Sequence, residues 1–168
     1  MGALTVEVHY RDERQVVVSD GPLLMRVISH GQSTPREAAF MAEMAREIHA
    51  RHGAVSALVV ITHGGKPPNR QDTLALASKA REIQAYGSII MVVVGLRPVA
   101  QLMFRATASI ARALGVNAAL ETELESAARR AVAELEDVEV EDVLRLYEDA
   151  ARRILVQPKP GPERQTSR

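Results

Sequence analysis

Two stretches decide the fold: residues 23–31 read LLMRVISHG, and residues 54–64 read AVSALVVITHG. Each is an apolar run that leads into a hydroxyl residue, a histidine and a glycine. Apolar runs without strict alternation are typical of strands that are covered on both faces, as in a parallel sheet. We therefore predict strands over residues 23–29 and 54–62, each followed by a turn and a helix.

The helix that follows the first run has clear end signals. Thr34 suits the N-cap, Pro35 suits the first helical position, and Glu37 completes a T-x-x-E capping box. Gly53 is placed to end the helix. After the second run, Asn69 offers the next N-cap, and the helix that it begins is predicted to end near residue 87. Its buried stripe is predicted to consist of Leu76, Ala77, Ala80 and Ile83.

The rest of the chain continues the alternation of strands and helices. Residues 4–10 and 15–19 predict a hairpin, residues 88–95 a buried strand and residues 117–121 an edge strand. A third helix opens at Pro98, and a second T-x-x-E box predicts a fourth that starts at Thr122 and runs to about residue 135. The residues of the third helix that are expected to face inward are Val99, Leu102, Met103, Ala106, Ile110 and Leu114.

This order predicts an α/β fold with a mixed, mainly parallel sheet that begins with an N-terminal hairpin. One domain is expected over residues 1–136, with an additional amphipathic helix within residues 137–156 and a disordered tail over residues 157–168. The apolar side of the added helix needs a partner surface, either on its own domain or across a dimer. Its predicted members are Val143, Leu144, Tyr147, Ala150, Ala151 and Ile154.

Composition narrows the function classes. The chain has 21 basic and 21 acidic residues, 3% aromatic residues and no cysteine. Balanced charge and scarce aromatic rings argue against nucleic-acid binding, and the absence of cysteine excludes disulfides and thiolate chemistry. The longest apolar stretch is far shorter than a membrane span. We expect a soluble, cytoplasmic protein without a membrane partner, a metal or a cofactor.

The carboxyl ends of parallel strands share one edge of a sheet, where open α/β folds bind ligands. His30, Thr62, His63 and Gly64 are expected at this edge. Lys66 and Arg97 follow on the same edge, and helix N-termini would add N–H groups for an anion. The two histidines could approach each other or a shared phosphate or nucleotide, which would make the chain a small-ligand sensor or enzyme at this edge. Alternatively, these residues only turn the chain from strand to helix.

Three segments resemble the STAS domain, the anti-sigma-factor antagonist fold. Residues 24–48 resemble its strand, glycine turn and first helix, residues 57–61 its central strand, and residues 118–127 its closing strand and acidic helix start. The resemblance covers roughly residues 4–135. It implies a non-enzymatic regulatory domain that binds an anti-sigma-like kinase or another regulator.

In that family a phosphorylated Asp-Ser pair opens the helix after the central strand, and Asp72-Thr73 is the nearest counterpart here. The resemblance makes Thr73 a phosphoacceptor candidate. It also makes residues 62–73, with Lys66, Arg70 and Asp72, and the helix that they begin a partner-binding surface. Thr62 stands where the family has an aspartate, and no glycine follows Thr73, so loss of the phospho-switch is a further possibility. In that case the domain would act as an assembly module through its last helix.

Overall fold

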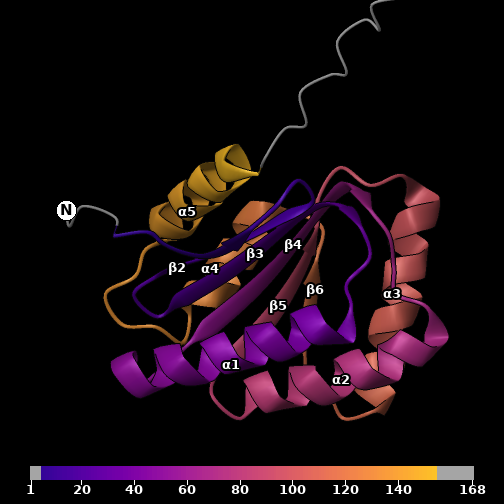
Figure 1. Cartoon of the computed structure of the whole chain (residues 1–168), viewed down its shortest axis with the longest axis horizontal. Helices are drawn as coiled ribbons and strands as arrows, with labels where there is room; N and C mark the ends of the chain where they lie inside the picture. Colours follow the sequence, from indigo (N-terminus) through magenta and orange to yellow (C-terminus); the bar gives the residue numbers. More distant parts are fainter. Residues whose placement is uncertain (1–4, 155–168) are drawn as a thin grey trace, which may run out of the picture.

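The computed structural model of the chain describes residues 5–154, and within them it contains one six-stranded sheet. The strands lie side by side in their order along the chain (Figure 1). The first three pair antiparallel and the last four pair parallel, which confirms the predicted α/β fold. Their bounds are β1 (Glu7–Arg11), β2 (Gln15–Asp20), β3 (Leu23–Gly31), β4 (Ser56–Gly65), β5 (Ser88–Val93) and β6 (Ala119–Glu121).

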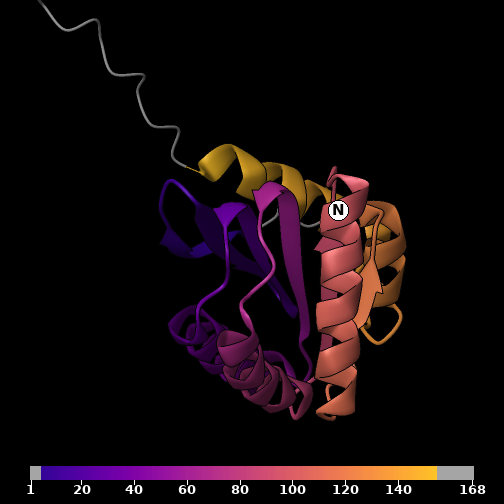
Figure 2. The same cartoon turned by 90° about the vertical axis from the view of Figure 1, so that its right-hand side faces the viewer.

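Helices cover both faces of this sheet (Figures 1 and 2). The described residues form α1 (Pro35–His52), α2 (Arg70–Gln84), α3 (Pro98–Ala113), α4 (Leu124–Val132) and α5 (Val140–Arg153). The three parallel crossovers advance across the sheet in one direction, so connections of one hand place α1, α2 and α3 on the same face. α4 and α5 pack on the opposite face.

The first two helices begin as predicted. The Thr34 hydroxyl accepts a hydrogen bond from the Glu37 N–H, and the Glu37 carboxylate accepts one from the Thr34 N–H, which completes the capping box of α1. Gly53 ends this helix in the left-handed conformation, at φ 77°. Asn69 caps α2 by accepting a hydrogen bond from the Asp72 N–H. These capping bonds form within a single helical turn and need no tertiary partner, so they can be predicted from the local sequence.

The sheet separates two apolar cores. Along β3, Val27 packs toward α4 and α5, whereas its neighbour Ile28 packs toward α3. This alternation is the two-residue period of a strand, with both faces covered. Phe104 is the buried residue of α3 and joins Ile28 on that face.

The C-terminal helix α5 packs on its own domain, against β2, β3 and α4. Val143, Leu146 and Ala150 are fully buried. Leu146 was not on the predicted apolar side, while Ala151, which was, is exposed. The helix is therefore rotated relative to the prediction. Its apolar face is covered within the chain, and the predicted tail over residues 157–168 lies outside the described residues.

The start of α4 differs from the prediction. Its N-cap is Glu123 without a side-chain capping bond, so the predicted box of Thr122 and Glu125 does not form, and the helix ends at Val132. The junction with β6 is held by a different group. The Glu121 carboxylate accepts hydrogen bonds from the Ser126 hydroxyl and the Arg130 guanidinium.

The largest correction concerns α3. Five of the six residues predicted to face the core are exposed: Val99, Leu102, Met103, Ala106 and Ile110. Val99 exposes 71% and Leu102 66% of its full area. The helix is apolar on two sides. Phe104 and the small Ala100 lie on the packed side, and the larger apolar side chains face outward.

Candidate functional site

The two histidine-glycine motifs are neighbours in the sheet. β3 and β4 run in parallel with His30 opposite Gly64 and Gly31 opposite Gly65. The pairing extends β4 to Gly65, beyond its predicted end at Thr62, so part of the predicted loop is strand. Gly31 and Gly64 are therefore brought to one edge of the sheet, as predicted.

Close contacts, from β3 at Gly64 and from within β4 at Gly65, explain why glycine occupies both positions. A Cβ added to Gly64 would lie 2.3 Å from the Ser29 carbonyl oxygen, and one added to Gly65 would lie 2.1 Å from Ile61 Cγ2. Real Cβ atoms do not come so close to other heavy atoms, so a side chain at Gly64 would have to displace the backbone of β3, and one at Gly65 would have to displace Ile61 of its own strand. The glycines of the second motif thus have a structural reason that is independent of any ligand.

The two histidines share a hollow at this edge, on the side of α5. The hollow is lined by His30, Thr62, His63 and Gly95 together with Tyr147 of α5. His30 Nδ1 lies 3.0 Å from the Ser29 hydroxyl oxygen. The Thr62 hydroxyl donates to the Ile28 carbonyl at 3.1 Å. His30 and His63 therefore line one exposed concave surface, which is large enough for a small ligand.

The other predicted residues are not part of that hollow. Lys66 lines a cavity on the opposite face of the sheet, and its backbone N–H donates to the Gly31 carbonyl at 2.8 Å. Arg70 and Asp72 stand in the first turn of α2, and Arg97 is the N-cap residue of α3. The predicted edge is thus divided by the sheet into two separate surfaces.

Thr73 is only 5% exposed. Its hydroxyl donates a hydrogen bond to the Asn69 carbonyl at 2.7 Å, within the first turn of α2. A kinase reaches this oxygen only if that turn opens first. The phosphoacceptor assignment stays a prediction that requires such local opening.

A buried ionic cluster next to the first motif was not predicted. Arg26, in the middle of β3, is 3% exposed, and its Nη2 donates to Glu37 Oε2 at 2.6 Å. Its Nε donates to Gln15 Oε1 at 2.7 Å. Arg14 donates to the other oxygen of Glu37, also at 2.6 Å. One carboxylate at the start of α1 therefore holds two arginines, Arg14 from the turn between β1 and β2 and Arg26 from β3.

The protonation of this cluster follows from burial and pairing. Burial alone would raise the pKa of Glu37, but the Thr34 N–H bond and the Arg26 charge outweigh it, and the pKa is lowered. Burial lowers the pKa of Arg26, and Glu37 opposes that shift. Arg26 stays charged because an arginine pKa starts far above neutrality. The sequence signal was a lone arginine inside an apolar strand.

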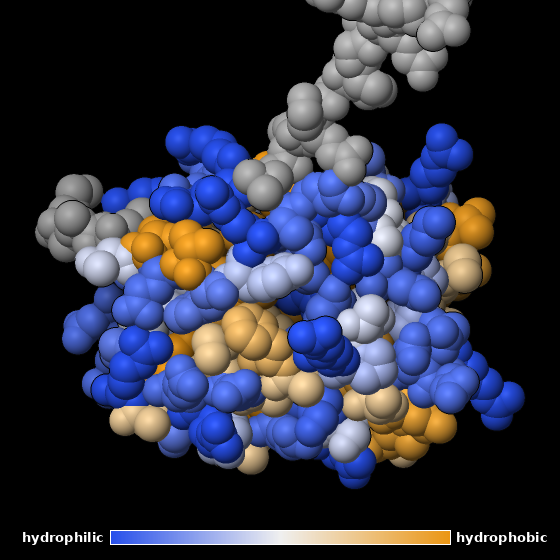
Figure 3. Space-filling view, viewed as in Figure 1, coloured by the Kyte–Doolittle hydropathy of each residue, from blue (hydrophilic) through white to orange (hydrophobic). Residues whose placement is uncertain are grey.

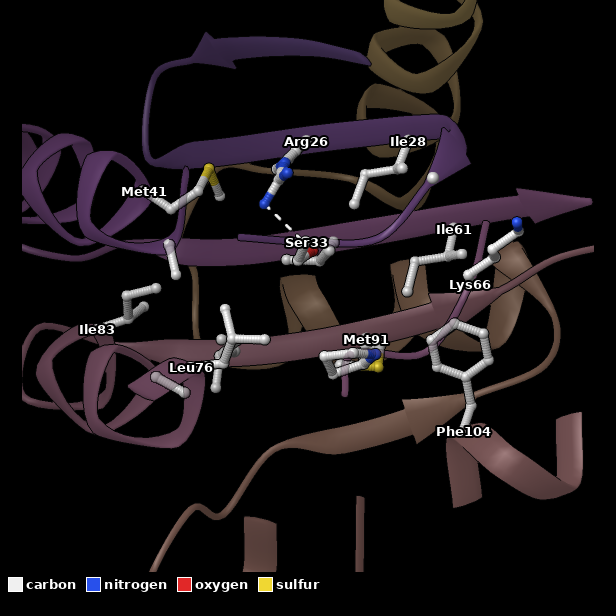
Figure 4. Close-up of a pocket in the computed structure, with 16 residues that line it drawn as sticks. Arg26, Ile28, Ser33, Met41, Ile61, Lys66, Leu76, Ile83, Met91 and Phe104 are labelled. Atoms are coloured by element: carbon white, nitrogen blue, oxygen red, sulfur yellow. Dashed lines mark hydrogen bonds between the residues drawn. The ribbon is translucent and has the colours of Figure 1, made fainter. Parts of the chain in front are cut away.

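A second concave site lies between the sheet and the helices α1, α2 and α3 (Figure 4). It has a volume of about 100 Å³. Apolar side chains make up most of its wall, and Arg26, Ser33 and Lys66 contribute the polar ones. The helix side chains Leu76, Ala80 and Ile83, which were predicted to form a buried stripe, line this cavity rather than fill it.

The described residues contain neither a cluster of metal ligands nor a membrane-spanning helix. No group of three or more His, Asp or Glu side chains that could hold a metal ion occurs within residues 5–154. None of the helices in that range is long and apolar enough to cross a membrane. No protein-family model matches the chain, and comparisons with curated proteins and with solved structures give no significant match. The features that bear on function are therefore the surfaces of this chain.

Proposed function

We propose that this chain is a non-enzymatic regulatory domain that acts by binding another protein, as its resemblance to STAS domains implies. The main support is a row of exposed apolar side chains on α3, which we call the α3 surface: Val99, Leu102, Met103, Ala106 and Ile110. Their spacing of three, four and seven residues puts them on one side of the helix. Apolar side chains grouped on a surface mark sites of interaction.

The partner surface that the family resemblance implies is a neighbour of the α3 surface. α2 packs beside α3 and exposes Leu74 in its second turn. Lys66 and Arg70 are exposed just before it. Apolar surface lies toward the right-hand side of Figure 3, where Figure 1 places α3 and the start of α2. Residues 62–73, α2 and α3 are therefore proposed to contact one partner together.

Charge indicates the chemistry of that partner. α3 contains no acidic residue. Arg97, Arg105 and Arg112 are exposed and make no ion pair within the described part of the chain. Arg105 and Arg112 are two turns apart and lie along one border of the α3 surface. An amphipathic helix with an apolar stripe and acidic residues beside it would complement this surface.

A homodimer through α3 is the less favoured arrangement, because it would bring arginines from two copies together. The kinase or other regulator that the family resemblance implies avoids this repulsion if its docking helix is acidic. Contacts of this kind weaken with salt, since exposed charges are screened.

Site-specific photo-cross-linking in cells of the source organism tests the proposal. A photoreactive residue at Leu102 is expected to trap one protein through an acidic amphipathic helix, identified by mass spectrometry. The same residue at Val8, which is 40% exposed on the edge strand β1, is the control. Charge reversal of Lys66 and Arg70 together is expected to reduce the yield at Leu102. Identical products at both positions, or products that contain only this chain, would contradict the proposal.

A second candidate is a small-ligand sensor at the other surface. It is favoured by the hollow that His30, Thr62 and His63 share. Titration with phosphate and with nucleotides, followed through the imidazole NMR signals, separates the two functions. Saturable shifts of both rings support the ligand site, and unchanged signals leave the protein-binding function as the better one.

A further inference from the structure

We propose that the cavity between the sheet and the helices α1, α2 and α3 binds a small, neutral, apolar molecule, with one aromatic ring or a short branched chain. This site is distinct from the α3 surface and from the histidine hollow. Its wall includes Ile28 and Ile61 from the sheet, Leu76 and Ile83 from α2 and Phe104 from α3 (Figure 4).

The size of the cavity is the first argument. Protein interiors are close-packed, and voids larger than a water molecule are few. A cavity of about 100 Å³ is well above that limit. An engineered cavity of about 150 Å³ with a similar wall of Leu, Ile and Phe stays free of water in another protein and binds benzene or xenon. The present cavity is thus of a size for one small apolar ligand.

The wall determines the class of ligand. The buried Arg26 already donates to Glu37 and Gln15, and its third contact is the Ser33 hydroxyl at 3.4 Å. Its charge is therefore compensated, and it offers little to an anion. The flexible side chains of Met41 and Met91 line the same space and can adapt to ligands of different shape. Lys66 adds a charge only where the wall reaches the surface. A neutral apolar molecule satisfies the interior of the cavity, whereas a charged group placed there would lose its hydration without compensation.

The position of the cavity gives it a route from solvent. Gly31 ends β3 and Ser33 follows it, Lys66 and Pro68 follow β4, and all four contribute to the wall. They lie at the carboxyl edge of the parallel strands, where open α/β sheets bind their ligands. Lys66 is exposed, so this part of the wall reaches the surface. The cavity therefore combines an apolar interior with an opening at the functional edge of the fold.

Methionine methyl NMR provides a direct test on the full chain, which has six methionines. Toluene and dissolved xenon are the probes. The methyl signals of Met41 and Met91 are expected to shift and saturate with either probe. Met25, which is fully buried on the other face of the sheet, and the exposed Met103 serve as internal controls and should not move. Unmoved Met41 and Met91 signals, or equal shifts of all methionines, would overturn the proposal.

Two further measurements make the test specific. Ala80→Leu places a larger side chain into the cavity and is expected to abolish the toluene and xenon shifts. Ala75→Leu, on the same helix and not part of the wall, should keep them. Benzoate has the same ring size with a carboxylate and is expected to shift Met41 and Met91 less than toluene does. Shifts that persist in Ala80→Leu, or a stronger response to benzoate, would refute the site or its neutral class.

Discussion

Arg26 Nη2 donates to Glu37 Oε2 at 2.6 Å and so joins the middle of β3 to the first turn of α1. The same carboxylate accepts the Thr34 N–H that closes the capping box. One side chain therefore starts a helix, fixes that helix on the sheet and compensates a buried arginine. This arrangement places the first turn of α1 beside the apolar cavity, because Ala38 of that turn lines the cavity together with Arg26 and Ser33.

The first prediction removes the charge of Glu37 and keeps its shape. Glu37→Gln is expected to lower the free energy of unfolding by about 3 kcal/mol, because it leaves Arg26 charged and buried without its counter-ion. Glutamine still serves at the third position of a capping box, so the cap itself is retained. Urea denaturation measures the change. Glu43→Gln, at an exposed site of the same helix, is the control and should change stability by less than about 0.5 kcal/mol.

The second prediction concerns acid. The folded pKa of Glu37 is lower than its ordinary value of 4.5. Its contribution to stability is therefore fully present above pH 4.5 and is lost as the pH falls through the lower folded pKa. Thermal melts between pH 3 and pH 7 should show this loss on the acid side. In Glu37→Gln the acid-side slope should be shallower; an identical slope in both proteins would assign the loss to other carboxylates.

The third prediction separates two roles of glycine. Gly64→Ala is expected to destabilise the protein by about 3 kcal/mol, because the new Cβ would overlap the Ser29 carbonyl oxygen and force the strands apart. Gly53→Ala has open space around its Cβ and only a positive φ, which costs about 1 kcal/mol. Chemical denaturation of the two variants gives the comparison. Equal losses would mean that β3 and β4 are not held so closely at this point.

The parts of the fold that could be predicted from the sequence are those set by contacts between residues close together in the chain. Thr34, Glu37 and Asn69 satisfy backbone groups within their own turn, so their roles are visible in the sequence. The second role of Glu37 depends on Arg26 and Arg14, which are 11 and 23 residues away. No local rule brings those side chains together. Only the antiparallel pairing of the hairpin and the docking of α1 do so.

The error in α3 has a different cause. Periodicity predicts which residues share a side of a helix, and Val99, Leu102, Met103 and Ile110 do share one. It does not indicate which of two apolar sides faces the core. Here Phe104 is buried on the other side, and the small Ala100 packs beside it, so that side faces the core. The residues that were predicted to be buried but are exposed form the α3 surface, on which the proposed protein-binding function depends.

The last prediction tests that orientation directly with two residues on the same helix. Leu102→Glu should change the free energy of unfolding by less than about 0.5 kcal/mol, because the side chain is exposed and the introduced carboxylate lies one turn from Arg105. Phe104→Ala should cost about 3 kcal/mol or more, since it removes a fully buried ring. Urea denaturation measures both. If Leu102→Glu proved as destabilising as Phe104→Ala, Leu102 would belong to the core, and the α3 surface could not be a docking site.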